Sequence, residues 1–377
     1  MTIMNSLSRS LPNKIETQQL WLNTVCPYYT MFPIDYPLRV LSKAKPGQWV
    51  LDPFCGRGTT AYASRLLGLN VYGTDTNPVA VAIASAKLAK ASIKDVTSLA
   101  EEFLNNSEPS GIPDGIFWDL CYNPDTLIDI CKIRDGLRGK RSDTAKILRA
   151  IFLGVLHGPL RKGEPSYLSN QMPRTFASKP DYSVTYWEKN NLFPPKINVL
   201  SVIKKRAERV LENLPERVNG SIIQCDARKI PDTNIRFDYI VTSPPYYGMT
   251  TYRPDQWLRY WALGYPPDVP YTDKTQISRG NTLSFIDSLS KVWQRVAELS
   301  NQGAFLYIRF GAVPSQPSDP KYIIKESLKY SGSPWQISTI KESSQIKNRT
   351  RQASQMGLNG RKNDALTEIE IYARLNS

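Results

Sequence analysis

The chain has 377 residues, of which 41% are hydrophobic and 22% charged, a balance that excludes a disordered or fibrous protein. Its formal net charge of +14 favours polyanionic partners such as nucleic acids. No apolar stretch approaches the roughly 20 residues that a membrane-spanning helix needs, and residues 1–20 lack the apolar core of an export signal, so we expect a cytoplasmic protein without a membrane partner.

Cysteine and histidine usage argues against metal sites and disulfides. The five cysteines are an odd number without zinc-ligand spacing, so we expect free thiols: Cys26, Cys55, Cys121, Cys131 and Cys225. His157 is the single histidine, which disfavours His-ligated metals and a Ser-His relay. We therefore expect no metal, and the sequence leaves the oligomeric state open.

The N-terminal part predicts an irregular segment followed by a β-α-β unit. Residues 1–45 are rich in aromatic residues and prolines and are expected to pack on the rest of the protein. A strand at 48–51, a glycine-bearing loop and a helix at 61–67 come next, and then a strand at 70–75 and a helix at 78–91. This order predicts two neighbouring parallel strands.

The α/β alternation stops between residues 96 and 215. Apolar spacing predicts helices at 144–156 and 199–214, joined by a loop rich in Pro and Tyr over 161–195. The alternation then resumes with strands at 221–225, 237–242, 304–310 and 368–373 and a helix at 284–300. We therefore predict an α/β domain made of residues 1–95 and 216–377, with a mostly helical insertion at 96–215.

Basic residues cluster inside this insertion. Positions 132–209 hold 17 basic and 6 acidic residues, whereas 96–131 hold seven acidic residues and no basic one. Such a cluster is either a solvated face or a surface that contacts phosphates, and its size favours the second. The loop at 161–195, with Tyr182 and Trp187, is either packed or turned towards nucleic acid, and its length favours the second.

Residues 52–60 carry the first chemical signal. They read Asp-Pro-Phe-Cys-Gly-Arg-Gly-Thr-Thr, with Gly56 and Gly58 where a strand turns into a helix, so that the backbone can approach a ligand closely. Asp75 ends the next strand, where a carboxylate can accept hydrogen bonds from both hydroxyls of a ribose. A tight turn and a helix cap are the structural alternatives, but together the two features favour an adenosine-containing ligand.

The second signal is Thr-Ser-Pro-Pro-Tyr-Tyr at 242–247, directly after an apolar strand. Two prolines end the strand abruptly and leave the carbonyls of Ser243 and Pro244 as free acceptors. The Ser243 hydroxyl is a further acceptor, and Tyr246 offers an aromatic face, so a planar ring with an exocyclic amine fits this turn. The alternative is a surface turn with aromatic residues packed beneath it.

Taken together, the two segments resemble the DNA amino-methyltransferases, enzymes that use S-adenosylmethionine to methylate cytosine N4 or adenine N6. The resemblance rests on residues 52–60 and 243–246, with weaker matches at 29–33, Asp75 and Asp226, and it covers 25–90 and 221–310. It implies a Rossmann-like class I methyltransferase sheet of about seven mostly parallel strands. The implied cofactor-binding residues are Thr30, Phe32, Asp52, Phe54, Gly56, Gly58, Thr59, Asp75 and Asp226.

Each of these residues has an implied role. Asp52, Phe54 and the glycines would hold the methionine part of the cofactor, with Thr30 and Phe32 closing over it. Asp75 would bind the ribose hydroxyls and Asp226 the adenine amino group. The implied catalytic residues are Ser243, Pro244, Pro245 and Tyr246.

The chemistry that the resemblance implies is direct transfer to an amine. Acceptors at Ser243 and the Pro244 carbonyl would stabilise charge that develops on the nitrogen, while Tyr246 stacks on a base flipped out of the duplex. Ser at the first catalytic position favours cytosine N4 over adenine N6. No Pro-Cys pair is present, which argues against the carbon-5 route with its nucleophilic cysteine.

The resemblance therefore implies a site-specific methyltransferase of double-stranded DNA, the modification enzyme of a prokaryotic restriction-modification system, in the cytoplasm at the nucleoid. The insertion would help to choose the DNA sequence. The alternatives are an adenine-N6 enzyme, an RNA amino-methyltransferase and a catalytically silent DNA-binding protein on the same fold. All hypotheses that include catalysis require the glycine turn and the double-proline turn to face each other.

Overall fold

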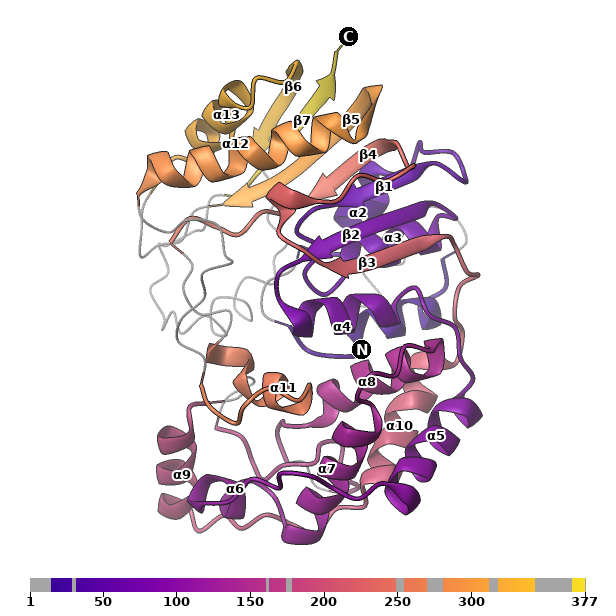
Figure 1. Ribbon diagram of the computed structural model, residues 1–377, viewed down its shortest axis with the longest axis vertical. Coiled ribbons are helices and arrows are strands. Elements are labelled where there is room, and N and C mark those ends of the chain that lie inside the picture. Colours follow the sequence, from indigo (N-terminus) through magenta and orange to yellow (C-terminus); the bar gives the residue numbers. More distant parts are fainter. Residues whose placement is uncertain are drawn as a thin grey trace.

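The computed structural model describes residues 15–28, 32–160, 163–173, 178–248, 254–269, 281–311, 318–342 and 368–376. Its centre is a seven-stranded sheet in the order β3-β2-β1-β4-β5-β7-β6 (Figure 1). Neighbouring strands from β3 to β5 are parallel, and β7 is antiparallel to both β5 and β6. The predicted α/β fold with a mostly parallel sheet is confirmed. The strands are β1 (Trp49–Asp52), β2 (Asn70–Asp75), β3 (Gly220–Gln224), β4 (Phe237–Thr242), β5 (Ser300–Gly311), β6 (Trp335–Glu342) and β7 (Glu368–Leu375).

Helices cover both faces of the sheet because the central strands are apolar on both sides. Leu51 and Ile240 pack in one cluster with α12 and α13, whereas Val50 and Val241, one residue away, pack in another with Ala61 of α3. This alternation is the period of two that a strand imposes. The helices concerned are α2 (Asp35–Val40), α3 (Thr59–Leu66), α12 (Thr282–Glu298) and α13 (Pro320–Tyr330).

A group of helices lies beyond one edge of the sheet, below α4 in Figure 1. Its core is continuous with that of α3 and α4, because Ile83 of α4 and Ile151 of α8 belong to the same apolar cluster. α11 follows the double-proline turn in the chain, yet Trp261 packs against Trp118 of α6 at 4.5 Å between ring centroids. α4 (Pro78–Ala86) contacts both β3 and α8, and the members of the group are α5 (Ile93–Asn106), α6 (Ile116–Cys121), α7 (Pro124–Gly136), α8 (Asp143–Val155), α9 (Pro180–Lys189), α10 (Val199–Leu211) and α11 (Trp257–Ala262).

Two segments that the sequence predicts to be irregular contain helices. The N-terminal segment includes the 3-10 helix η1 (Gln18–Thr24) and α2. The predicted loop at 161–195 contains α9, which begins at Pro180, a residue preset for the first turn of a helix. Trp187 of α9 is fully buried against Phe117, so the expectation that this side chain faces nucleic acid is wrong. Burial of its large ring holds the segment in a helix.

Candidate functional site

The sheet brings the two predicted loops together. β1 and β4 are parallel neighbours, so the glycine loop and the double-proline turn leave the same edge of the sheet. The Thr242 hydroxyl donates a hydrogen bond of 2.7 Å to Asp52 Oδ1, across 190 positions of sequence. The residues that begin the two motifs are therefore in direct contact.

The glycine loop is tightly packed at Gly58. Its φ of +78° lies in the left-handed region, and a Cβ placed there would lie 2.8 Å from the Ala84 Cβ of α4. Gly58 begins α3, and Thr59 is buried in the first turn. The loop is also tied to β2, because the Cys55 amide donates to the Thr74 carbonyl at 2.9 Å. The backbone at Gly58 has room for no larger residue.

Asp52 is buried, with 1% of its surface exposed, and one of its oxygens is without a partner among the described residues. Oδ1 accepts from Thr242 and from the Phe54 amide at 3.2 Å, whereas no described residue donates to Oδ2. Burial raises the pKa of this carboxyl to about 6, against hydrogen bonds that lower it. A buried, unpaired acceptor suits a cationic donor such as the amino group of the cofactor's methionine part, so Asp52 fits that group.

Asp75 ties the glycine loop to the start of α4. Oδ2 accepts the Gly56 amide at 2.9 Å, and Oδ1 accepts the Asn77 amide at 2.8 Å. Burial raises the pKa of this carboxyl also to about 6. Each carboxylate oxygen has a second lone pair, which leaves acceptor capacity for ribose hydroxyls. The Asn77 side chain donates to the Tyr28 hydroxyl at 3.0 Å, so the segment before residue 29 reaches this loop.

The remaining predicted cofactor residues lie in different surroundings. Asp226 follows β3, begins the 3-10 helix η2 (Ala227–Lys229) and forms an ion pair of 2.5 Å with Arg228. Burial raises the pKa of this carboxyl, but hydrogen bonds from Arg228 outweigh burial and hold the pKa below its usual value. Phe32 is buried against Tyr36, and Phe54 is half-buried. Thr30 lies outside the described residues.

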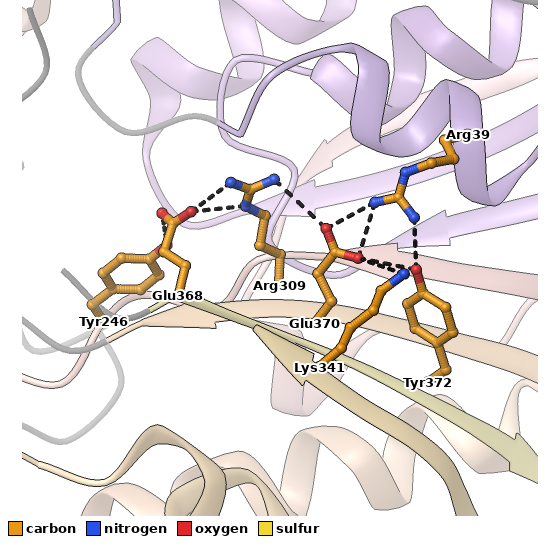
Figure 2. Close-up of polar contacts among 7 residues, drawn as sticks. All are labelled: Arg39, Tyr246, Arg309, Lys341, Glu368, Glu370 and Tyr372. Carbon is orange, nitrogen blue, oxygen red and sulfur yellow. Dashed lines mark hydrogen bonds and ion pairs between the residues drawn. The ribbon is translucent and has the colours of Figure 1, made fainter. Parts of the chain in front are cut away.

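The double-proline turn is half-buried, with Pro244 buried at its centre. Among the described residues, none donates to the Ser243 hydroxyl or the Pro244 carbonyl. The Tyr246 ring packs edge-on against Phe310 at 5.5 Å, and its hydroxyl donates to Glu368 of β7 (Figure 2). Glu368 is a residue that sequence reasoning missed, since it carries no motif and reaches the turn only through the antiparallel pairing of β5 with β7.

Part of the basic excess in the insertion is internal. Lys132, Arg134 and Arg149 donate to backbone carbonyls, and Arg134 is buried beside Asp135. Arg138, Lys140 and Arg141 are exposed at the turn between α7 and α8. Charge counting therefore overstates the basic surface. Within the described segments, no helix has the length and apolarity to cross a membrane, and no three potential metal ligands come together.

Comparison with known proteins supports the resemblance. A sequence profile of the N6/N4 methyltransferase family, described as DNA methylase, matches residues 4–86, which include the glycine loop but not the double-proline turn. Type II methyltransferase M.MvaI from Kocuria varians is 26% identical over 255 residues, or 60% of this chain. The match covers 52% of that relative, so the chain spans about half the length of the curated protein it matches.

Solved structures give weaker likenesses. The rRNA methyltransferase AviRa from Streptomyces viridochromogenes is 12% identical with a TM-score of 0.36, covering 96% of this chain and 94% of its own. TehB from Haemophilus influenzae is 11% identical with a TM-score of 0.35, covering 96% and 67%. Neither of these two structures indicates the substrate of this protein. From the family profile and the curated relative, the resemblance to the DNA amino-methyltransferases is confirmed, and S-adenosylmethionine is the cofactor that this resemblance indicates.

Proposed function

We propose that this protein transfers a methyl group from S-adenosylmethionine to the exocyclic amine of a base in double-stranded DNA, at cytosine N4. The observation that carries the proposal is the hydrogen bond between Thr242 and Asp52, which joins the glycine loop to the double-proline turn at one sheet edge. We also propose that it serves as the modification enzyme of a restriction-modification system in a prokaryotic cytoplasm, which the similarity to a type II methyltransferase supports.

On the cofactor side, the chain supplies carboxylates on three neighbouring strands. The unpaired Asp52 Oδ2 accepts from the amino group of the methionine part, and Asp75 accepts from the ribose hydroxyls. Asp226 follows β3, the strand that pairs with β2. Its carboxylate can accept from the adenine amine while it keeps its ion pair with Arg228. When bound, the cofactor supplies an electrophilic methyl group on a sulfonium.

On the base side, the turn supplies acceptors and a ring. The Ser243 hydroxyl and the Pro244 carbonyl accept the two hydrogens of the target amine and draw its nitrogen towards tetrahedral geometry. The nitrogen would form one bond to the methyl carbon while the methyl–sulfur bond breaks, with the electron pair of that bond left on the sulfur as a neutral thioether, and the nitrogen would lose one proton to solvent. Because positive charge develops on the nitrogen only during transfer, these acceptors stabilise the transition state more than the ground state. Tyr246 stacks on the flipped base.

The deciding experiment identifies the modified nucleoside. DNA from cells that express the protein is digested to nucleosides and measured by mass spectrometry against cells that lack it. N4-methylcytosine is expected. N6-methyladenine would overturn the cytosine assignment but keep the amine chemistry, whereas labelled methyl transfer to rRNA or tRNA and not to duplex DNA would overturn the DNA substrate.

Tyr246→Ala separates the base side of the site from the cofactor side. We expect the variant to lose most methyl transfer, because the stacking surface is gone, and to keep its affinity for S-adenosylmethionine in calorimetric titration. Loss of cofactor affinity would show that Tyr246 belongs to the cofactor side.

A further inference from the structure

We propose that Glu368 and Arg309 are positioning residues that hold the Tyr246 ring in the plane it needs to stack on a flipped base. Together with Phe310 and Gly311 they form what we call the Tyr246 support, at the end of β5 and the start of β7. Figure 2 shows Arg309 and Glu368 beside Tyr246. The inference rests on the proposed function, and it assigns a role to residues outside both motifs.

Among the described residues, the support contacts Tyr246 at its hydroxyl and at its ring. The phenol hydroxyl donates to Glu368 Oε1 at 2.7 Å, and the ring makes a T-shaped contact with Phe310 at an interplanar angle of 77°. A tyrosine side chain has two main torsions, and a contact at the ring together with one at its tip restrains both. Glu368 reaches the ring because Gly311 and Glu368 are paired in the β5–β7 register.

Gly311 leaves space for the ring. A Cβ at this position would lie 3.0 Å from Tyr246 Cε2 and 3.1 Å from Glu368 Cγ, both tighter than ordinary van der Waals contact. The tyrosine ring and the glutamate stem thus lie against the bare backbone of Gly311. A larger residue there would push the ring out towards the turn.

Glu368 itself is fixed by Arg309. The Arg309 Nε and Nη2 donate to Glu368 Oε2 at 3.0 and 2.5 Å, which leaves Oε1 for the tyrosine. Arg309 is 8% exposed, and although burial lowers its pKa, the carboxylate of Glu368 outweighs burial and raises it. A charge-assisted pair on a buried strand is a stiff acceptor, more so than a free surface glutamate.

Holding the ring in advance favours catalysis, because the ordering cost is met before the base arrives. The tether acts through the phenol oxygen alone, so Tyr246→Phe removes it and keeps the stacking ring. Glu368→Ala removes the same tether from the other side. If both act through one hydrogen bond, their effects will not add.

The test is single-turnover transfer of labelled methyl groups to unmethylated plasmid DNA. We expect Tyr246→Phe and Glu368→Ala each to slow transfer by about tenfold, the size of one hydrogen bond to a charged group, and the double variant to be no slower than the slower single one. Glu368→Gln keeps an acceptor oxygen and should recover part of the rate. Affinity for S-adenosylmethionine should be unchanged in all of them.

Tyr372→Phe is the matched control, because its hydroxyl belongs to the same network through Arg39 and Glu370 but does not touch Tyr246. Its transfer rate should equal that of the unmodified protein. Multiplying losses in the double variant, or rates unaffected by Tyr246→Phe, would overturn the positioning role. Absence of transfer by the unmodified protein would instead overturn the proposed function, so the two failures are distinguishable.

Discussion

Asp52 and Asp75 are the residues on which the candidate cofactor site depends. Burial raises the pKa of both to about 6, so each is ionised at neutral pH against a desolvation cost. Asp52 also has an oxygen that no described residue pairs. Unpaired buried acceptors are costly in a folded protein, and they persist at sites where a ligand completes them. If the proposed cofactor binds here, it should therefore stabilise the folded protein.

Asp52→Asn tests this at the residue scale. A carboxyl whose pKa is raised on folding keeps its proton longer in the native state, so its contribution to stability is present below pH 3.8 and is lost as pH rises through about 6. Between pH 5 and 8 the unfolding free energy of the unmodified protein should fall. Roughly 1 kcal/mol of this fall should be absent in the variant. Urea unfolding at both pH values measures this.

The same variant should lose affinity for S-adenosylmethionine, since an amide cannot neutralise a cationic donor. Asp232→Asn is the control, because Asp232 is exposed at the surface. If Asp52→Asn kept the pH dependence of the unmodified protein, the pKa of Asp52 would be the same in the native and the unfolded state.

At the scale of the element, the start of α3 is tightly constrained. Gly58 combines a left-handed φ with contact against α4, whereas Gly47 has a similar φ of +85° and no atom within 4 Å of a built Cβ. Substitutions at the two glycines therefore distinguish the cost of backbone strain from the cost of a steric clash. Of this pair, only Gly58 couples its loop to a neighbouring helix.

Gly47→Ala should cost roughly 1 to 2 kcal/mol of unfolding free energy, the strain of a left-handed alanine. Gly58→Ala should cost clearly more, because Ala84 or the loop must also shift. It should weaken cofactor binding as well, which Gly47→Ala should not. Denaturant midpoints and calorimetric titration give both quantities, and equal costs at the two positions would contradict tight packing of α3 on α4.

The turn between α7 and α8 is the element we expect to contact DNA. The Arg138 guanidinium lies near Gly264, which follows α11, since its Nη2 is 3.8 Å from a Cβ placed on Gly264. Lys140 and Arg141, in the same turn as Arg138, are exposed. Lys140→Ala with Arg141→Ala should weaken binding of duplex DNA. The slope of log affinity against log salt is negative. It should become shallower by about 0.9 for each phosphate that the variant no longer neutralises. Fluorescence anisotropy over a salt series measures the slope.

Lys321→Ala with Lys325→Ala on α13 removes the same charge from an exposed helix that packs on the sheet and not on the helical group. This control should leave the slope unchanged. An equal effect in both double variants would mean that only the net charge matters.

At the scale of the whole molecule, a polar network joins the two ends of the chain. Glu370 of β7 is buried and accepts two hydrogen bonds from Arg39 of α2, at 2.8 and 2.9 Å, across 331 positions (Figure 2). Tyr372 and Lys341 lie on the same carboxylate, at 3.0 and 3.4 Å. Burial raises the pKa of Glu370, but the hydrogen bond and charge of Arg39 outweigh burial and lower it.

Glu370→Ala should lower the unfolding free energy by about 2 kcal/mol, the size of a hydrogen bond to a charged group, because the half-exposed Arg39 stays solvated without its partner. Because the pKa of Glu370 is lowered on folding, this contribution is present above the unfolded pKa near 4.5 and is lost as pH falls through the folded value. Urea unfolding at pH 7 measures the loss. Glu342→Ala, an exposed change on β6, should cost little, and equal losses would contradict the network.

Local pattern located most of the described strands but fewer than half of the described helices. Six strands could be placed from apolar runs, whereas β6 could not, because its alternation of half-buried and exposed residues breaks at the register shift between Ile337 and Thr339. α9 was missed for a related reason, since Trp187 is held by Phe117, seventy positions earlier. Basic residues such as Arg134 were counted as surface charge from the sequence, whereas in the folded protein the Arg134 side chain donates to a backbone carbonyl.

The sequence by itself determined the two turns and the order of strands and helices in the parallel part of the sheet, because left-handed glycines, prolines without an amide hydrogen and apolar runs act on their own neighbourhood. Only the tertiary structure decided that β4 lies beside β1, so that Thr242 meets Asp52, and that β7 returns beside β5, so that Glu368 reaches Tyr246. Burial and hydrogen-bond partners depend on segments that are distant in the chain. Their contacts arise from the packing of the whole sheet and are encoded in no single stretch of residues.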